Sequence, residues 1–397
     1  MRTTMRTLIT RCTSFPSSLF STLPSWTPCA VIGVVSLLGL VLALTLPNLG
    51  TQEHRVAFLG TGGNLIVNDI PRLVEALGDD SLSQSSCFHW KGSLASLLYT
   101  GNGMYEYWKT DRAYIDDQNY NYLRDYGACT PTQLLLGSDD KLYNSNYNGA
   151  YYDDGLNPCF YEGRFFKYNE RTYANETGWT AVVFADQTKR MAFQDTRDDV
   201  LDSLESDYGG MLFGDSDQSL STDATIVVLA PHAFWSDNTN MTGLEDIPTF
   251  SSLVYEGAVQ YTSKLQELMD EAISNSKGNN QNKRRKIRIA PVGPAFLWVY
   301  EEDSEMYEKL FNSDGIRASV YGSYLTACVV YCTITGNMPP PDSHGTVRNL
   351  FKRSRAVSGA ANGYPDEGEA EYLFDVARKV AKQGRLPSSL DTDSSRI

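Results

Sequence analysis

An aspartate and an arginine three residues apart, Asp314 and Arg317, precede a long apolar stretch at 320–335 that is typical of a helix. An aspartate followed by a histidine at this spacing could orient a general base that takes a proton from a nucleophile. An arginine cannot act as that base, because its guanidinium stays protonated near neutral pH. The two residues are therefore expected to form an ion pair, or Arg317 to hold an anionic ligand.

Three further residues carry groups suited to acyl-transfer chemistry. Thr61 follows an apolar run at 55–59, and its hydroxyl could attack a carbonyl if a base removed the proton. Among the four histidines, His232 is the candidate base, because it follows a predicted strand; a buried structural histidine is the simpler interpretation. Asp186 also follows a predicted strand and is interpreted as structural or ligand-binding.

The elements that would position these residues alternate along the chain. Apolar, β-branched runs predict strands at 55–59, 179–185, 223–231 and 286–293. Helical patterns lie between and after them, at 68–78, 197–204, 250–276, 301–311 and 320–335. This alternation predicts an α/β fold with a parallel central sheet and helices on both faces. Functional residues in such folds gather at the carboxyl ends of the strands.

Two segments depart from the alternation. Residues 105–178 are rich in Tyr, Asn, Asp and Gly and predict an irregular insertion, either a loop layer packed by its own tyrosines or a sugar-binding surface. Residues 341–384 form a C-terminal extension whose stretch 365–384 predicts one capped helix. The last residues, 385–397, are Ser- and Asp-rich and are expected to be disordered.

The N-terminal region predicts a membrane anchor. Residues 29–46 are uncharged and long enough to span a bilayer. The arginines before them place 1–28 in the cytosol and the folded domain in the lumen or outside the cell. A cleaved signal peptide is the alternative. Two sequons, at Asn175 and Asn240, fit glycosylation on that side of the membrane.

Charge and cysteine content limit the partners. The formal charge of −14 disfavours nucleic acid and anionic lipid surfaces as binding partners. Cys87, Cys129 and Cys159 lie in loop-like sequence, so any disulfide is expected among them. Cys328 and Cys332 are expected to be buried thiols on a helix, since no further metal ligands lie nearby. We expect neither a metal site nor a cofactor.

Six segments together resemble the SGNH (GDSL-like) hydrolases, a family with a three-layer α/β/α flavodoxin-like fold. They cover roughly residues 55–340 and read "FLGTGGNLIVNDIPRLVEAL" (58–77), "GSLASLLYTGNGM" (92–104), "YGACTPTQLL" (126–135), "VVFADQTK" (182–189), "RIAPVGPAFLWVYEE" (288–302) and "SDGIRASVYGSYL" (313–325). The resemblance implies an esterase or acyl-transfer site built from a serine, a glycine, an asparagine and an Asp-His pair.

The resemblance also implies that this site is degenerate. The serine position falls at Gly62, or at Gly63 if the turn carries one extra residue, and the asparagine position falls at Ala185. The oxyanion-binding glycine matches Gly92 and the acid matches Asp314, while Arg317 occupies the histidine position. The first hypothesis is a membrane-anchored protein without activity that binds a glycan or acylated glycan in the former active site. The alternatives are an active esterase or acyltransferase rebuilt around Thr61 or His232, and a structural secretory-pathway glycoprotein.

Overall fold

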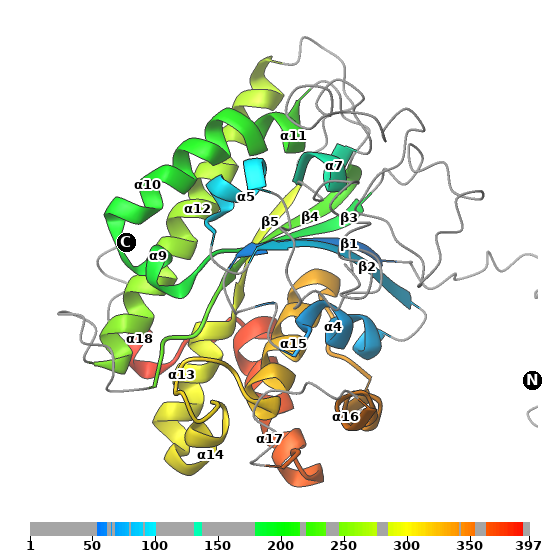
Figure 1. The fold of residues 1–397 in the computed structure, drawn as a ribbon, viewed down its shortest axis with the longest axis vertical. Coiled ribbons are helices and arrows are strands. Elements are labelled where there is room, and N and C mark those ends of the chain that lie inside the picture. Colours follow the sequence, from blue (N-terminus) through cyan, green and yellow to red (C-terminus); the bar gives the residue numbers. More distant parts are fainter. Residues whose placement is uncertain are drawn as a thin grey trace, which may run out of the picture. The chain divides into compact units, whose positions relative to one another are not determined.

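A computed structural model shows a five-stranded sheet with helices on both of its faces (Figure 1). It describes residues 54–61, 65, 68–78, 81–89, 92–100, 131–136, 179–214, 220–235, 246–275, 285–340, 343–353 and 363–391. The strand order is β2-β1-β3-β4-β5, and each neighbouring pair is parallel. The strands are β1 (His54–Thr61), β2 (Leu82–His89), β3 (Trp179–Ala185), β4 (Leu220–Ala230) and β5 (Lys286–Pro291). The expected α/β fold with a parallel central sheet is confirmed.

The chain reverses its direction across the sheet between β1 and β3. From β1 it moves outward to β2 and then returns across β1 to β3, which pairs with β1 through Leu59↔Phe184 and Gly60↔Ala185. In doubly wound sheets, the crevice outside the carboxyl ends at such a switch point is the usual ligand site. Thr61 ends β1 and Asp186 follows β3, so both lie at this point.

One face of the sheet carries the larger apolar core. The elements on that face are α4 (Ile70–Gly78), α13 (Val292–Glu302), α14 (Ser304–Lys309), α15 (Val320–Thr335), α16 (Ser343–Arg353), α17 (Glu367–Ala377) and the π-helical turn η8 (Arg378–Lys382) (Figure 1). Helix α15 is buried along 320–334, which explains why its sequence is apolar all round rather than on one stripe. Its Cys328 and Cys332 are buried thiols, as expected.

The opposite face carries the second core. Its elements are α5 (Leu94–Thr100), α7 (Pro131–Leu136), α9 (Thr188–Ala192), α10 (Gln194–Ser203), the π-helical turn η6 (Leu204–Tyr208), α11 (Gly209–Phe213) and α12 (Ile247–Asn275) (Figure 1). Strands β1 and β3 contribute alternate side chains to the two cores, since Phe58 and Val183 face one core and Ala57 and Val182 face the other.

The structure corrects the sequence-based interpretation of one segment at the edge of the sheet. Residues 82–89, which had been interpreted as loop, form strand β2, so Cys87 is fully buried beside Leu59 and is a thiol rather than half of a disulfide. The strand was missed because "LSQSSCFH" contains three serines and a glutamine in place of β-branched residues. Cys129 and Cys159 lie outside the described residues.

The C-terminal region contains more helix than the sequence predicts. Helix α16 was not expected, and the predicted helix at 365–384 is present as α17 continued by η8. Residues 388–391, which were expected to be disordered, form helix α18 (Ser388–Asp391). It is ordered because Ser388 and Ser389 hydrogen-bond to the Glu301 carboxylate through their backbone N–H groups and hydroxyls, and because Leu390 is buried.

Several expectations fall on residues that the structure does not describe. These are the anchor at 29–46, the sequons at Asn175 and Asn240, and all of the insertion 105–178 except α7. Within the described ranges, no helix combines the length and apolar character needed to cross a bilayer.

Candidate functional site: the carboxyl ends of the strands

A buried hydrogen-bond cluster joins the carboxyl ends of β1 and β3. The Thr61 hydroxyl donates to Oδ1 of Asp186 at 2.8 Å, and the Gln187 backbone N–H donates to the same oxygen at 2.8 Å. On the other side, the Tyr261 hydroxyl of α12 donates to Oδ2 of Asp186 at 3.2 Å. Thr61, Asp186 and Tyr261 are each only 1% exposed. Two of the sequence candidates, Thr61 and Asp186, therefore lie in direct contact.

The Asp186 carboxyl group is buried and accepts three hydrogen bonds, and these two features shift its pKa in opposite directions. Burial raises the pKa of Asp186, while the hydrogen bonds from Thr61, Gln187 and Tyr261 and the charge of Arg190 act against that rise. The effect of burial is the larger, so the pKa of Asp186 lies above its ordinary value. The cluster is suited to holding β1, β3 and α12 together at the switch point.

The Gly92 loop is attached to the same place. The Gln187 side chain donates to the Gly92 carbonyl at 2.7 Å, and the Tyr208 hydroxyl donates to the Leu94 carbonyl at 2.9 Å. A side chain at position 92 would force Ser96 to move, because an added Cβ would lie 2.6 Å from Oγ of Ser96. Gly92 is thus tied to Gln187, two residues beyond Ala185, the buried last residue of β3. An asparagine side chain is absent there because position 185 has only a methyl group.

His232 lies just beyond the end of β4 in an aromatic cluster. Its ring stacks on Phe296, with centroids 4.5 Å apart, and meets Phe311 edge-on at 5.4 Å. Nε2 lies 3.1 Å from the Ile316 carbonyl oxygen, and because a carbonyl only accepts, this nitrogen carries the proton. Burial lowers the pKa of His232 to about 4, although the Ile316 hydrogen bond and the Asp314 charge oppose that shift.

His232 and Thr61 do not form a base–nucleophile pair in this structure. They follow β4 and β1, which are separated by β3, and two strand spacings amount to roughly 10 Å. Among the described residues no hydrogen bond links them, and both are nearly inaccessible, at 3% and 1% exposure. His232 instead packs against Phe296 and Phe311 and contacts the Ile316 carbonyl.

Asp314 and Arg317 form the expected ion pair, in the loop that precedes α15. Nε of Arg317 donates to Oδ2 of Asp314, and Oδ1 accepts the backbone N–H groups of Ile316 at 2.9 Å and Arg317 at 3.0 Å. Burial raises the pKa of Asp314, but these hydrogen bonds and the Arg317 charge outweigh it, so the pKa lies below its ordinary value. The aspartate therefore orders its own loop, and the arginine neutralises it.

This loop is fastened to the end of β4, where two apolar side chains reach solvent. The Trp235 backbone N–H donates to the Gly315 carbonyl at 2.8 Å, alongside the contact between His232 and Ile316. Trp235 and Ile316 are 39% and 40% exposed, and the Trp235 ring stacks over the buried Phe311. Arg317 follows Ile316 in the chain, and these three exposed side chains are here called the Trp235 surface (Trp235, Ile316 and Arg317).

Sequence reasoning did not single out Trp235, Ile316, Gln187 or Tyr261. A tryptophan three residues after the strand-end His232 was a usable signal for Trp235. Tyr261 carried no signal, because it lies 75 residues from Asp186 on a helix of ordinary amphipathic pattern.

The remaining candidates are only partly placed. Gly62 and Gly63 lie outside the described residues, although the flanking Asn68 donates to the Ser323 hydroxyl of α15 at 3.0 Å. That hydrogen bond links the loop after β1 to the helix that follows Arg317. In the described ranges, no three His, Cys, Asp or Glu residues gather as a metal site would require.

Comparisons with known proteins identify no family for this chain. No family model matches it, and no curated protein matches it by sequence. A crystal structure of a DUF4886 family protein from Bacteroides uniformis ATCC 8492 is similar in fold, with 12% identity, a TM-score of 0.41, and coverage of 86% of this chain and 99% of that one. A likeness at this level carries no argument about function.

Proposed function

We propose that the chain is an SGNH-hydrolase-like protein that has lost catalysis and binds a ligand at the carboxyl ends of its strands. The order β2-β1-β3-β4-β5 is the order of flavodoxin-like sheets, the architecture that the sequence resemblance implies. Gly92, Ala185 and Asp314, which align with three of that family's site positions, all lie at or near the strand ends.

The ion pair between Arg317 and Asp314 is the observation that carries the proposal. In a working triad the acid orients a histidine, which takes the proton of the nucleophile. Here the acid is neutralised by a permanent cation, and the sequence has glycine at positions 62 and 63 where the nucleophile would stand. Loss of a nucleophile or a base in a comparable triad lowers turnover by about 10⁶-fold.

The Trp235 surface supports a binding role and indicates a carbohydrate ligand. An exposed indole offers a flat face to a sugar ring, and Arg317, whose side chain is 45% exposed, offers donors to hydroxyl or acyl oxygens. Residues 29–46 and the two sequons support a membrane-anchored protein whose domain meets glycans or acylated glycans in the secretory lumen or outside the cell.

The contact between Thr61 and Asp186 favours the alternative of a rebuilt esterase. In that mechanism Asp186 would accept the Thr61 proton while Oγ attacks an acyl carbon. Two observations argue against this mechanism. Thr61 is only 1% exposed, and Asp186 already accepts two further hydrogen bonds, from the Gln187 backbone N–H and the Tyr261 hydroxyl.

Hydrolysis assays on the purified full-length chain decide between these functions. With short-chain aryl esters and acetylated sugars as substrates, we expect no turnover above buffer, and no change on Thr61→Ala or His232→Gln. Turnover that Thr61→Ala or His232→Gln abolishes, in a variant whose thermal unfolding shows that it is folded, would establish the rebuilt esterase and overturn the proposal.

Binding is tested by thermal shift with acetylated and unacetylated oligosaccharides. We expect stabilisation that rises with ligand concentration and is lost in Trp235→Ala. Tyr300→Ala is the matched control, since it removes another exposed aromatic side chain, at 38% exposure. If no saccharide stabilises the wild-type chain, the structural glycoprotein becomes the better account.

A further inference from the structure

Two of the three side chains of the Trp235 surface belong to one short hairpin. It comprises residues 310–319, between α14 and α15, and is closed by the antiparallel pair Phe311↔Ala318. Ile316 and Arg317 lie at its turn end, where the Arg317 carbonyl accepts the Asn312 backbone N–H at 2.8 Å. The position of this segment, here called the 310–319 hairpin, therefore decides where both side chains are presented.

Trp235 is held by the same hairpin through two contacts. Its backbone N–H donates to the Gly315 carbonyl at 2.8 Å, and its ring stacks over Phe311 with centroids 6.5 Å apart. Phe311 is 1% exposed, so it gives the indole a fixed support. The geometry of the whole Trp235 surface thus depends on the 310–319 hairpin.

One carboxylate from the C-terminal extension joins the two ends of the hairpin. Oε1 of Glu369, on α17, pairs with Nζ of Lys309, directly before the hairpin, at 2.8 Å. Oε2 accepts the hydroxyl of Tyr321, two residues after the hairpin, at 2.9 Å. The Ser319 hydroxyl adds a further link, because it donates to the Lys309 carbonyl. Glu369 therefore connects the entry and the exit of the hairpin.

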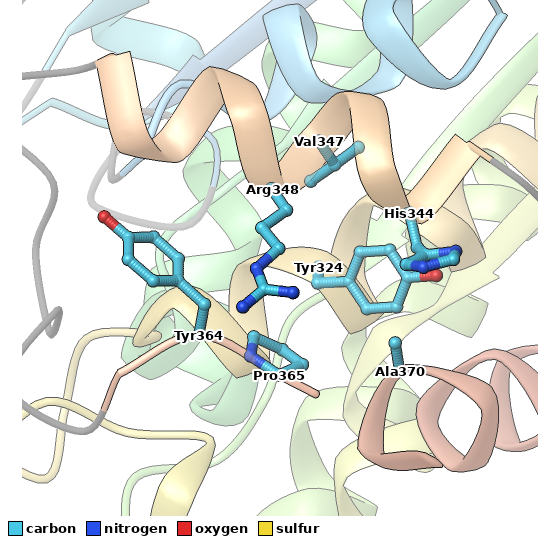
Figure 2. Close-up of a pocket in the computed structure, with 7 residues that line it drawn as sticks. All are labelled: Tyr324, His344, Val347, Arg348, Tyr364, Pro365 and Ala370. Carbon is cyan, nitrogen blue, oxygen red and sulfur yellow. The ribbon is translucent and has the colours of Figure 1, made fainter. Parts of the chain in front are cut away.

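The start of α17 is itself fixed, which gives the Glu369 side chain a firm base. Ala370 is 5% exposed and lines a small depression together with Tyr324 of α15 (Figure 2). The Asp366 backbone N–H donates to Oε2 of Glu369 at 2.9 Å, as part of a capping box. Burial raises the pKa of Glu369, but its hydrogen bonds and the Lys309 charge outweigh burial, so the pKa lies below its ordinary value. The side chain is therefore charged at neutral pH.

We propose that Glu369 is a positioning residue for the Trp235 surface, because it holds the two ends of the 310–319 hairpin together. It acts through Lys309 and Tyr321 rather than by contacting the ligand. The inference rests on the proposed binding role of the Trp235 surface. It makes the C-terminal extension a part of the binding site, although the extension lies beyond residues 55–340, which carry the resemblance to the hydrolases.

Hydrogen exchange of the full-length chain, followed on peptides that cover 310–319, tests the positioning without a ligand. Tyr321→Phe keeps the ring and leaves the α17 cap intact, and it should speed exchange in the hairpin about fivefold, as expected for the loss of one hydrogen bond. Glu369→Ala removes both contacts and should speed it more than about tenfold. Glu369→Gln keeps an acceptor for Tyr321 but loses the ion pair, so it should restore most of the protection. A capping role alone would speed exchange in α17 and leave the hairpin unchanged.

Glu302→Ala is the matched control. Glu302 also binds a lysine and a tyrosine hydroxyl where the C-terminal extension meets the body of the protein, with Lys379 at 3.2 Å and Tyr372 at 3.5 Å. It lies on α13, and neither of its partners adjoins the hairpin in the sequence. Glu302→Ala should therefore leave exchange in the hairpin unchanged.

Calorimetric titration with an acetylated oligosaccharide measures the effect on binding. The affinity of Tyr321→Phe should fall about fivefold, and that of Glu302→Ala should equal the wild-type affinity. The inference is wrong if Tyr321→Phe and Glu369→Ala leave the hairpin protected, if Glu302→Ala speeds its exchange equally, or if a loosened hairpin binds as tightly as wild type. Failure of the wild-type chain to bind any saccharide would instead overturn the proposed function, and the exchange rates would still decide whether Glu369 positions the hairpin.

Discussion

The Thr61 hydroxyl donates a 2.8 Å hydrogen bond to the Asp186 carboxylate, across the junction where β1 and β3 end side by side. Thr61 directly precedes Gly62 and Gly63 in the sequence, the two positions at which the resemblance would place a nucleophile. The Thr61 hydroxyl group already donates its hydrogen bond to the buried Asp186 carboxylate, and the side chain is buried from solvent. The pair therefore joins β1 and β3 at their carboxyl ends.

Thr61→Val should lower the free energy of unfolding more than the same substitution at the buried Thr333 does. The variant keeps the shape of the side chain but leaves Asp186 with one donor fewer in a buried site, which costs about 1–3 kcal/mol. Thr333→Val is the control, because that buried hydroxyl donates to the Val329 carbonyl within a helix. Its loss should cost less than about 0.5 kcal/mol. Urea unfolding midpoints of the two variants measure the difference, and equal midpoints would contradict the role given to Asp186.

Asp314 should matter more to stability than its partner Arg317. Asp314→Ala leaves the backbone N–H groups of Ile316 and Arg317 without their acceptor, a loss comparable to that of a helix cap, about 0.5–2 kcal/mol. Arg317→Ala removes only a solvent-exposed ion pair, worth about 0–1 kcal/mol. Asp314→Asn keeps an acceptor oxygen and should resemble Arg317→Ala. Chemical denaturation at neutral pH ranks the three variants, and the reverse order would refute a loop-ordering role for Asp314.

His232 should make the protein less stable as the pH falls below neutrality. Its pKa is about 4 when folded and near 6.5 when unfolded, so between these values the unfolded chain binds a proton that the folded chain does not. Stability contributed by the neutral ring is present above pH 6.5 and is lost as the pH falls toward 4, by on the order of 3 kcal/mol.

The measurement is the free energy of unfolding from pH 7.5 to 4.5 for wild type and His232→Gln. Because other groups titrate in both proteins, the difference between the two curves isolates His232. We expect wild type to lose more stability than the variant over this range. Parallel curves would show that the ring is not buried as a neutral group.

Gln187 should hold the Gly92 loop in place. Gln187→Ala removes the donor to the Gly92 carbonyl, so the amides of α5 should exchange with deuterium about fivefold faster, which corresponds to the loss of one ordinary hydrogen bond. Gln194→Ala is the control, since that side chain hydrogen-bonds to Asp198 on an exposed helix face at 2.7 Å. Unchanged exchange in α5 after Gln187→Ala would show that Tyr208 alone secures the loop.

Part of this architecture could be predicted because its signals are local. The strand at 179–185 and the helix at 320–335 were predicted with the bounds that the structure shows, since long apolar runs bounded by turn residues reveal themselves within a few residues. Strand β2 was missed because its serines are buried by neighbours elsewhere in the chain, and α16 because its apolar residues are few.

The sequence by itself determined which chemical groups are present: an arginine at 317, a methyl group at 185, and glycine at 62 and 63. It also determined the alternation of strands and helices, because hydrophobic periodicity is a property of neighbouring residues. Only the tertiary structure decided that Asp186 receives Thr61 and Tyr261, that His232 is enclosed by aromatic rings, and that Glu369 binds both Lys309 and Tyr321. Such contacts join segments far apart in the chain, so they depend on how whole elements pack, which no local pattern encodes.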